Sequence, residues 1–121
     1  MKVIIAGTRF LGGNLPQRVD EAVEASGLRF FISEVVSGRA PGIDSAGEVW
    51  AKSNGIPVQP FPAKWRNVDG SRDMRAGFKR NQEMADYADA LIAVWDGKSN
   101  GTCDMICRAV KRKLRVYIHY V

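Results

Sequence analysis

The sequence predicts an α/β fold: a single Rossmann-like, doubly wound parallel sheet of five strands in the order 3-2-1-4-5. Two observations lead to this fold class. Short apolar runs alternate with segments of helical periodicity along the whole chain. The runs at 3–6 and 90–95 are continuously apolar, as expected of strands that are covered on both faces. With 121 residues, the chain is predicted to form one domain, residues 1–121.

The predicted strands are apolar or β-branched, and residue types that are common in turns follow each of the first four. The segment 30–36, for example, combines aromatic and β-branched residues and stops at Ser37-Gly38. A strand–helix–strand alternation gives parallel strands joined by right-handed crossovers. The five predicted strands are residues 3–6, 30–36, 57–61, 90–95 and 116–121.

Helix signals separate these strands. Asn14, with Gln17 three residues later, resembles a capping pair, and Gly27 closes the first helix. The second helix is predicted over residues 44–53, before Asn54-Gly55. Helical spacing predicts the inward faces of the last two helices as Phe78, Gln82, Ala85 and Ala88 on the third, and Cys103, Ile106, Cys107, Val110 and Leu114 on the fourth.

Composition excludes several classes of protein. No stretch approaches the roughly 20 apolar residues of a membrane span, and the start lacks a signal-peptide pattern, so we expect a cytoplasmic protein without membrane contact. Cys103 and Cys107 are the only cysteines and are interpreted as reduced packing thiols. With His119 as the single histidine, we expect no metal site, no His-dependent triad and no cofactor.

The charge balance favours a polyanionic partner. The formal net charge is +5, and basic residues are densest between positions 108 and 115. Because these residues fall at the end of the last predicted helix, they also suit the negative end of its dipole. A solvated helix end is therefore the favoured interpretation of this basic run, and nucleic acid stays open as a second-choice partner. The oligomeric state also stays open, with a homo-oligomer as one alternative.

Three loops should converge where the first and fourth strands lie side by side, at the switch point of the sheet. These loops are residues 7–9, 37–44 and 96–102, and each leads toward a helix N-terminus that favours an anion such as phosphate. Gly38, Gly42 and Gly101 would allow close backbone approach and positive φ. Each taken alone is more readily interpreted as a plain turn glycine, and the presence of three such loops at one edge of the sheet favours a ligand site. The loops match neither the GxGxxG pattern nor a Walker A motif.

Other candidate ligand contacts have an ordinary structural alternative. Arg80 would reach a phosphate or lie on the surface, Asp44 would bind a ribose hydroxyl or cap its helix, and Trp95 would stack on a base or pack in the core. The polar segment 62–75 is a long loop, a kind that is often functional. The predicted ligand-binding set is Gly7, Thr8, Arg9, Ser37, Gly38, Arg39, Gly42, Asp44, Arg80, Asn81, Trp95, Asp96, Ser99, Gly101 and Thr102.

Four ordered blocks of the sequence carry a family resemblance: residues 4–9 (IIAGTR), 36–44 (VSGRAPGID), 80–85 (RNQEMA) and 93–102 (AVWDGKSNGT). In these blocks the chain resembles the SLOG superfamily, most closely its small YspA-like, cpYpsA-related branch, which is largely of unknown function. The resemblance spans almost the whole chain. It implies a Rossmann-like fold that binds nucleotides, NAD- or ADP-ribose-related signals, or single-stranded DNA in bacterial or phage biology.

Two more distant groups within this resemblance point to different functions. The cytokinin-activating LOG phosphoribohydrolases carry a Gly-Thr-x-x-Glu loop, and DprA-like proteins carry Ser-Gly-Gly-Ala-x-Gly-Ile-Asp. This chain departs from both, because Met105 stands at the glutamate position and Arg39 at the second glycine. The leading hypothesis is a sensor or sequestering protein for a nucleotide-derived ligand. The alternatives are an N-glycosidic hydrolase acting on nucleoside monophosphates, which the missing glutamate disfavours, and a single-stranded DNA binder.

Overall fold

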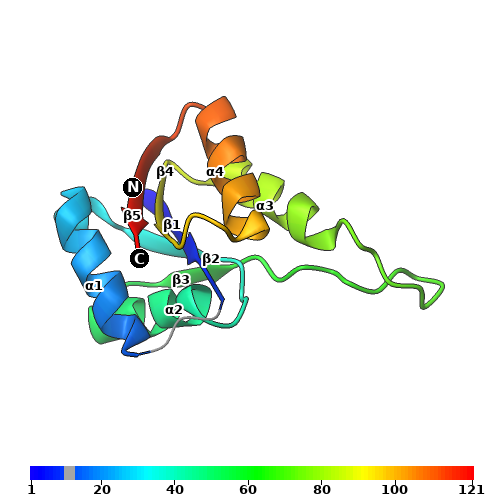
Figure 1. The fold of residues 1–121 in the computed structure, drawn as a ribbon, viewed down its shortest axis with the longest axis horizontal. Helices are drawn as coiled ribbons and strands as arrows, with labels where there is room; N and C mark the ends of the chain where they lie inside the picture. Colours follow the sequence, from blue (N-terminus) through cyan, green and yellow to red (C-terminus); the bar gives the residue numbers. More distant parts are fainter. Residues whose placement is uncertain (10–12) are drawn as a thin grey trace.

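Five parallel strands form one sheet in the computed structural model, which describes residues 1–9 and 13–121. The strand order is β3-β2-β1-β4-β5, so the predicted fold class and strand order are both confirmed (Figure 1). The strands are β1 (Lys2–Gly7), β2 (Glu34–Ser37), β3 (Val58–Pro60), β4 (Ala90–Trp95) and β5 (Arg115–Tyr120).

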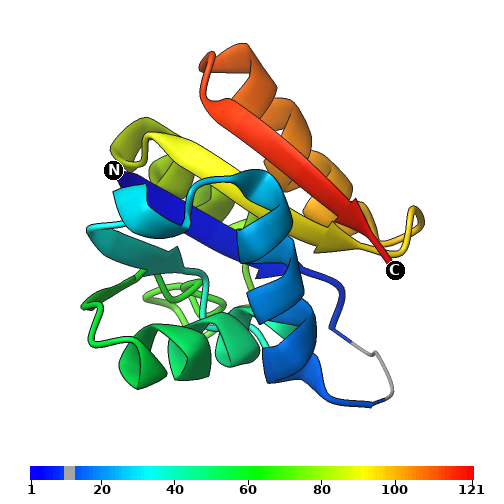
Figure 2. The same cartoon turned by 90° about the vertical axis from the view of Figure 1, so that its left-hand side faces the viewer.

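Two helices cover each face of the sheet. Helices α1 (Leu15–Ser26) and α2 (Ile43–Ser53) lie on one face, and α3 (Ala76–Tyr87) and α4 (Asn100–Lys111) on the other (Figures 1 and 2). Each layer closes its own buried hydrophobic cluster against the central strands. Because β1 pairs with both β2 and β4, the switch point lies between β1 and β4, as predicted.

The predicted signals at the ends of α1 are confirmed. The backbone N–H of Gln17 donates to Oδ1 of Asn14 at 3.3 Å, which satisfies one of the free donors in the first turn. Gly27 ends the helix with a φ of 74°, a left-handed conformation that glycine adopts without steric cost. Local sequence chemistry therefore sets both ends of this helix.

The prediction for the second strand is wrong at its start. Residues Arg29–Phe31 form a 3-10 turn, with Phe30 93% exposed, and β2 begins only at Glu34, opposite Lys2 of β1. Leu28 and Ile32 fill the core on either side of this turn. The aromatic pair Phe30-Phe31 thus sits on a turn that swings outward, although its residue types favour a strand.

The prediction for the inward face of the last helix is wrong for three of its five residues, whereas Ile106 and Leu114 do pack against the core. Cys103 and Cys107 are exposed, as is 58% of Val110, whereas Thr102, Met105 and Ala109 are buried. The buried stripe lies about one residue, or roughly 100°, around the helix from the predicted one. Cys103 and Cys107 lie on the exposed side of α4 and are therefore not packing thiols.

Between β3 and α3 the chain leaves the body as an arm (residues 62–75), which projects to the right in Figure 1. Arg66 and Arg72 pair as an antiparallel bridge, and the N–H of Asn67 donates to the carbonyl of Ser71 at 2.8 Å near the tip. The N–H of Asp73 donates to the carbonyl of Trp65 at 2.6 Å. The predicted long loop is therefore an irregular hairpin.

Within residues 1–9 and 13–121, no helix is both long and apolar enough to cross a membrane. In the same part of the chain, no three His, Cys, Asp or Glu side chains gather where they would hold a metal ion.

Candidate functional site

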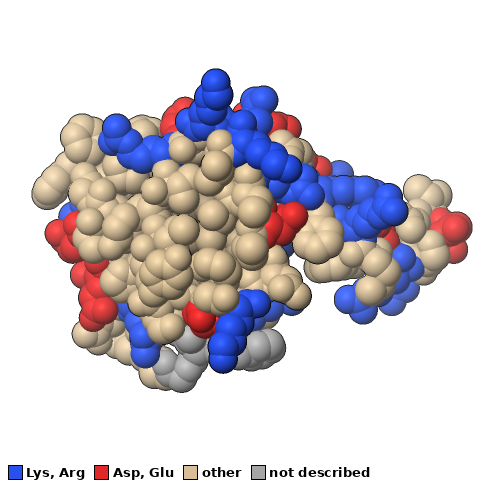
Figure 3. Space-filling model, turned by 45° about the horizontal axis from the view of Figure 1, so that its top comes forward, with Lys and Arg blue, Asp and Glu red and all other residues tan. Residues whose placement is uncertain are grey.

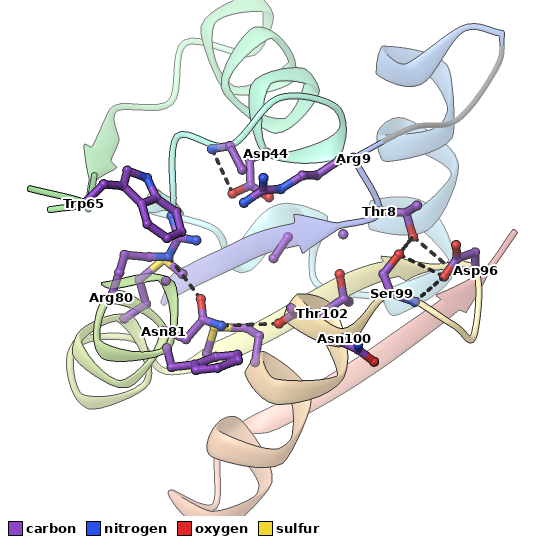
Figure 4. Close-up of a pocket in the computed structure, with 18 of the residues that line it drawn as sticks. Thr8, Arg9, Asp44, Trp65, Arg80, Asn81, Asp96, Ser99, Asn100 and Thr102 are labelled. Carbon is purple, nitrogen blue, oxygen red and sulfur yellow. Dashed lines mark hydrogen bonds between the residues drawn. The ribbon is translucent and has the colours of Figure 1, made fainter. Parts of the chain in front are cut away.

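A cavity of about 480 Å³ lies beyond the carboxyl ends of β1 and β4, between α3, the start of α4 and the base of the arm (Figure 4). This is the edge of the sheet at which the sequence places the site. Ten residues of the predicted set line the cavity, and their role in binding remains a prediction. They are Gly7, Thr8, Arg9, Asp44, Arg80, Asn81, Asp96, Ser99, Gly101 and Thr102.

Five predicted residues lie outside the cavity wall: Ser37, Gly38, Arg39, Gly42 and Trp95. Four of them belong to the loop after β2, where Ser37 donates from Oγ to Glu48 at 2.7 Å and Arg39 forms an ion pair with the same carboxylate at 3.5 Å. The indole of Trp95 donates to the carbonyl of Ser99 at 3.1 Å and packs beside Tyr120. These residues support the loops and do not face the cavity.

The loop glycines have three different roles. Gly42 precedes α2 with a φ of 87°, and a side chain there would overlap the backbone of Arg9. A Cβ on Gly38 would lie 2.6 Å from Nη1 of Arg80. Gly101 has no positive φ, because it is the second residue of α4, and nothing lies within 4 Å of the place its Cβ would take. The positive φ expected at Gly101 is therefore wrong, although the space beside it is open.

The loop after β4 is held by the carboxylate of Asp96. Its Oδ1 accepts the N–H groups of Lys98 and Ser99, each at 2.8 Å, and these bonds hold the pKa of Asp96 below its usual value. The N–H of Asp96 in turn donates to Oγ1 of Thr8 at 3.1 Å. No described side chain caps α4, which begins at Asn100, so the donors of its first turn remain for a ligand.

The buried face of α3 carries two polar residues, Arg80 and Asn81, which are 8% and 4% exposed. Arg80 donates from Nη1 to the carbonyl of Gly38 and from Nε to Oδ1 of Asn81 at 3.1 Å. Asn81 donates from Nδ2 to the carbonyl of Gly101 at 3.2 Å. The predicted inward residue Phe78 is 43% exposed instead. Arg80 and Asn81 are buried because the loops on both sides satisfy their polar groups.

Asp44 is a buried carboxylate in the cavity wall, and only 5% of the residue is exposed. Burial raises the pKa of its carboxyl to about 6, although the nearby Arg80 and Arg9 guanidinium groups act in the opposite direction. Burial likewise lowers the pKa of Arg80. Asp44 is not the N-cap of α2, which is Gly42; its carboxylate accepts the N–H of Ala40 at 3.3 Å. The capping role expected for Asp44 is thus corrected to loop support.

The sequence reasoning missed an aromatic and apolar wall. Trp65, at the base of the arm, lies against Gly77 of α3, and Arg72 lies over its ring at 5.2 Å. The one sequence signal that could have predicted this wall is a tryptophan within a long polar loop. The cavity residues outside the predicted set are Ala6, Ala40, Trp65, Met74, Gly77, Phe78, Met84, Asn100 and Met105.

Together, the walls combine two kinds of chemistry. Arg9 and the open start of α4 offer positive charge and N–H donors, which suit a phosphate group. Trp65 and Phe78 offer aromatic surface, which suits a flat ring. A cavity with a few polar groups in a largely apolar wall is typical of a ligand site.

No family model matches this sequence, and no curated protein matches it. Solved structures do. DNA processing protein A (DprA) from Streptococcus pneumoniae superposes with a TM-score of 0.77 at 19% sequence identity, over 97% of this chain and 49% of that chain. DprA from Helicobacter pylori, whose structure concerns its single-stranded DNA binding mode, gives a TM-score of 0.67 at 19% identity, over 98% and 64%.

These likenesses confirm the Rossmann-like fold. This chain spans about half the length of the first DprA chain and 64% of the second. The finer assignment to the YspA-like branch or to the phosphoribohydrolases stays a prediction.

Proposed function

We propose that this chain binds single-stranded DNA and holds one nucleotide of the strand in the cavity. One observation carries the proposal: Arg9, the uncapped start of α4 and the indole of Trp65 all line the same cavity. A nucleotide needs a cationic or N–H partner for its phosphate and an apolar face for its base, and this cavity offers both.

The phosphate is proposed to lie over the first turn of α4. Gly101 leaves open space there, and the donors of Asn100, Gly101 and Thr102 begin the helix without a described side-chain cap. Arg9 is exposed and lines the same cavity (Figure 4). Its guanidinium would add a charge-assisted hydrogen bond to the phosphate.

The base is proposed to lie against Trp65. The indole is 36% exposed, and contacts with Gly77 and Arg72 hold its ring in place. Stacking on aromatic side chains tolerates any base and requires that the base be unpaired. Single strands are therefore favoured over duplexes.

Two further observations favour a strand over a free nucleotide. Lys and Arg side chains gather along the arm beside the cavity, where a longer polyanion would be bound (Figure 3). The fold is also similar to that of the Helicobacter pylori DprA, the subject of a structure on single-stranded DNA binding.

A free nucleotide-derived ligand, related to NAD or ADP-ribose, is the second candidate. The volume of about 480 Å³ favours it, because small-molecule sites span roughly 300–1,000 Å³. The buried Asp44 carboxylate would accept ribose hydroxyls. In that case the chain would act as a sensor or a sequestering protein.

Fluorescence anisotropy with a labelled 12-nucleotide thymidine strand, its duplex with an adenosine strand, and NAD and ADP-ribose as competitors tests the two candidates. We expect the single strand to bind more tightly than the duplex, with affinity that falls as salt rises. Trp65→Leu should weaken binding by about tenfold or more, the scale of one lost stacking contact.

Phe30→Leu is the matched control, because Phe30 is an exposed aromatic residue on the turn before β2, outside the cavity wall. It should leave affinity for the strand within about twofold. Equal losses in the two variants, or equal affinity for single strand and duplex, would contradict the proposal. Displacement of the strand by micromolar ADP-ribose, together with a copurifying small molecule in native mass spectra, would favour the second candidate.

A further inference from the structure

A second, smaller cavity of about 270 Å³ lies between the arm and α3. Arg80 lines both cavities, so its side chain stands in the wall that they share. Lys64 and Arg66 of the arm line the second cavity together with Lys79 and Arg80 of α3. Four cationic side chains thus face a hollow next to the proposed nucleotide site.

Acidic side chains balance these cations only in part. Asp73 is bound to Lys79, Nζ to Oδ2 at 2.7 Å, and this contact lowers the pKa of Asp73. The other carboxylate in the wall, Glu83, is exposed. Neither Lys64 nor Arg66 forms an ion pair within residues 1–9 and 13–121. Lys64 and Arg66 therefore bring positive charge to the cavity, while the carboxylate of Asp73 in the same wall is paired with Lys79.

The pairing inside the arm gives an independent reason to expect an anion. Arg66 and Arg72 stand opposite each other in the antiparallel bridge, and like charges at such a position are destabilising. Arg72 is turned onto the Trp65 ring, which leaves Arg66 on the side of the second cavity. An anion bound beside Arg66 would relieve the repulsion between the two guanidinium groups.

We propose that the second cavity binds the phosphate of the next nucleotide of the strand, through Lys64 and Arg66. The inference rests on the proposed function, because this cavity lies next to the one that would hold the first nucleotide, with Arg80 in the wall between them. The chain would then hold two successive phosphates, one over the start of α4 and one under the arm. A ligand with a single phosphate would use only the first.

Isothermal titration calorimetry with two probes tests this assignment: thymidine 5′-monophosphate and the 5′-phosphorylated thymidine dinucleotide. The wild-type protein should bind the dinucleotide at least tenfold more tightly. The double variant Lys64→Ser/Arg66→Ser should lose that advantage and keep its affinity for the mononucleotide within about twofold. Its dinucleotide affinity should also depend less steeply on salt, by roughly 0.7 in the log–log slope for the lost phosphate contact.

The matched control is Lys111→Ser/Arg115→Ser, which removes the same charge near the far end of α4. It should keep the tenfold preference for the dinucleotide. The Lys64→Ser/Arg66→Ser protein should melt no lower than the wild type, because the change removes one of two opposed arginines. Its melting temperature therefore shows that any loss of binding is local.

Three results would overturn the assignment: equal wild-type affinity for the two probes, equal losses for both probes in the Lys64→Ser/Arg66→Ser variant, or the same loss in the control. If that variant loses affinity for ADP-ribose and not for the dinucleotide, the cavity serves a directly linked diphosphate, and the strand assignment is wrong. If the wild-type protein binds neither thymidine probe, the proposed function fails, and this inference fails with it.

Discussion

Two segments look alike in sequence and differ in structure: the first loop, which runs from the end of β2 into α2 (residues 37–44), and the second loop, which runs from the end of β4 into α4 (residues 96–102). Each contains glycine and a carboxylate, and each leads into a helix at the same edge of the sheet. The first loop is packed against other parts of the chain, so that Gly42 lies against the backbone of Arg9 and Gly38 against Arg80. The second is braced by Asp96 and leaves open space at Gly101.

The first loop supports buried side chains, whereas the second loop leaves backbone donors open to a ligand. In the loop 37–44, small residues make room for the buried Asp44 and Arg80. In the loop 96–102, Gly101 leaves the first donors of α4 uncovered. A glycine near the start of a helix therefore leaves space beside the backbone, and its neighbours decide whether protein fills that space or a ligand can.

The largest expected effect is on stability, in the first loop. Gly42→Ala should lower the free energy of unfolding by about 4 kcal/mol, because it adds strain at positive φ and an overlap with Arg9. Urea denaturation measures the change. Gly101→Ala is the control from the second loop and should leave stability equal or raise it by up to about 1 kcal/mol. Similar losses of stability in Gly42→Ala and Gly101→Ala would show that the two loops are packed alike.

The two carboxylates should give opposite pH dependences. Burial raises the pKa of Asp44 to about 6, from an unfolded value of 3.8. The folded state then holds this proton more tightly, so the stability that it contributes is complete below pH 3.8 and is lost as the pH rises through about 6. Asp96, whose pKa is lowered, contributes stability above its unfolded pKa of 3.8 that is lost as the pH falls.

Denaturation curves at pH 4 and pH 7 for the wild type and Asp44→Asn measure the first effect. Relative to Asp44→Asn, the wild type should lose on the order of 3 kcal/mol between these two values. A parallel pH dependence in the two proteins would show that Asp44 keeps an ordinary pKa. Asp96→Asn provides the contrast in curves taken below pH 3.8, because there the wild type should lose stability relative to it as the pH falls toward the lowered folded pKa of Asp96.

In the second loop the expected effect is on binding. Gly101→Val should fold as stably as the wild type, because nothing lies within 4 Å of the added Cβ and Gly101 has no positive φ. It should weaken binding of the thymidine strand by about tenfold, or about 1.4 kcal/mol, because the side chain would occupy the proposed phosphate position. Anisotropy titration checks this. If the folded variant binds the strand as tightly as the wild type, the phosphate does not lie over the start of α4.

Arg9→Ala should also weaken strand binding, by about 1.5 kcal/mol, if Arg9 makes one charge-assisted hydrogen bond to the phosphate. Because Arg9 is exposed, stability should stay within about 0.5 kcal/mol of the wild type. Arg80→Ala is less suitable, since Arg80 is buried and hydrogen-bonded to the loop 37–44. If calorimetry finds the same affinity for the strand in Arg9→Ala as in the wild type, Arg9 does not contact the phosphate.

The smallest expected effect is on catalysis. Cleavage of an N-glycosidic bond needs a carboxylate near the sugar, and Met105 lines the cavity where the sequence resemblance to LOG phosphoribohydrolases predicts a glutamate. The carboxylate of Asp104 already accepts hydrogen bonds at Oδ2 from Nδ2 of Asn81 at 3.0 Å and from Nε of Arg108 at 2.8 Å. Chromatography after incubation with AMP should detect no free adenine. Robust turnover that disappears in Asp96→Asn or Asp104→Asn would make the chain an enzyme.

The sequence by itself determined the order of the strands and the edge at which the cavity lies. The buried runs at 3–6 and 90–95 required a sheet covered on both faces, and parallel crossovers fix where its loops converge. It also determined both ends of α1, because the bond from Gln17 to Asn14 and the positive φ of Gly27 depend only on neighbouring residues.

Only the tertiary structure decided which side chains face the cavity. Arg80 and Asn81 are buried because distant loops supply their hydrogen-bond partners. Helix α4 buries Met105 and Ala109 against the core and leaves Cys103 exposed. The position of Trp65 depends on an arm that folds back onto Gly77. These contacts join segments that are far apart in sequence, whereas helical periodicity and turn signals record only local preference.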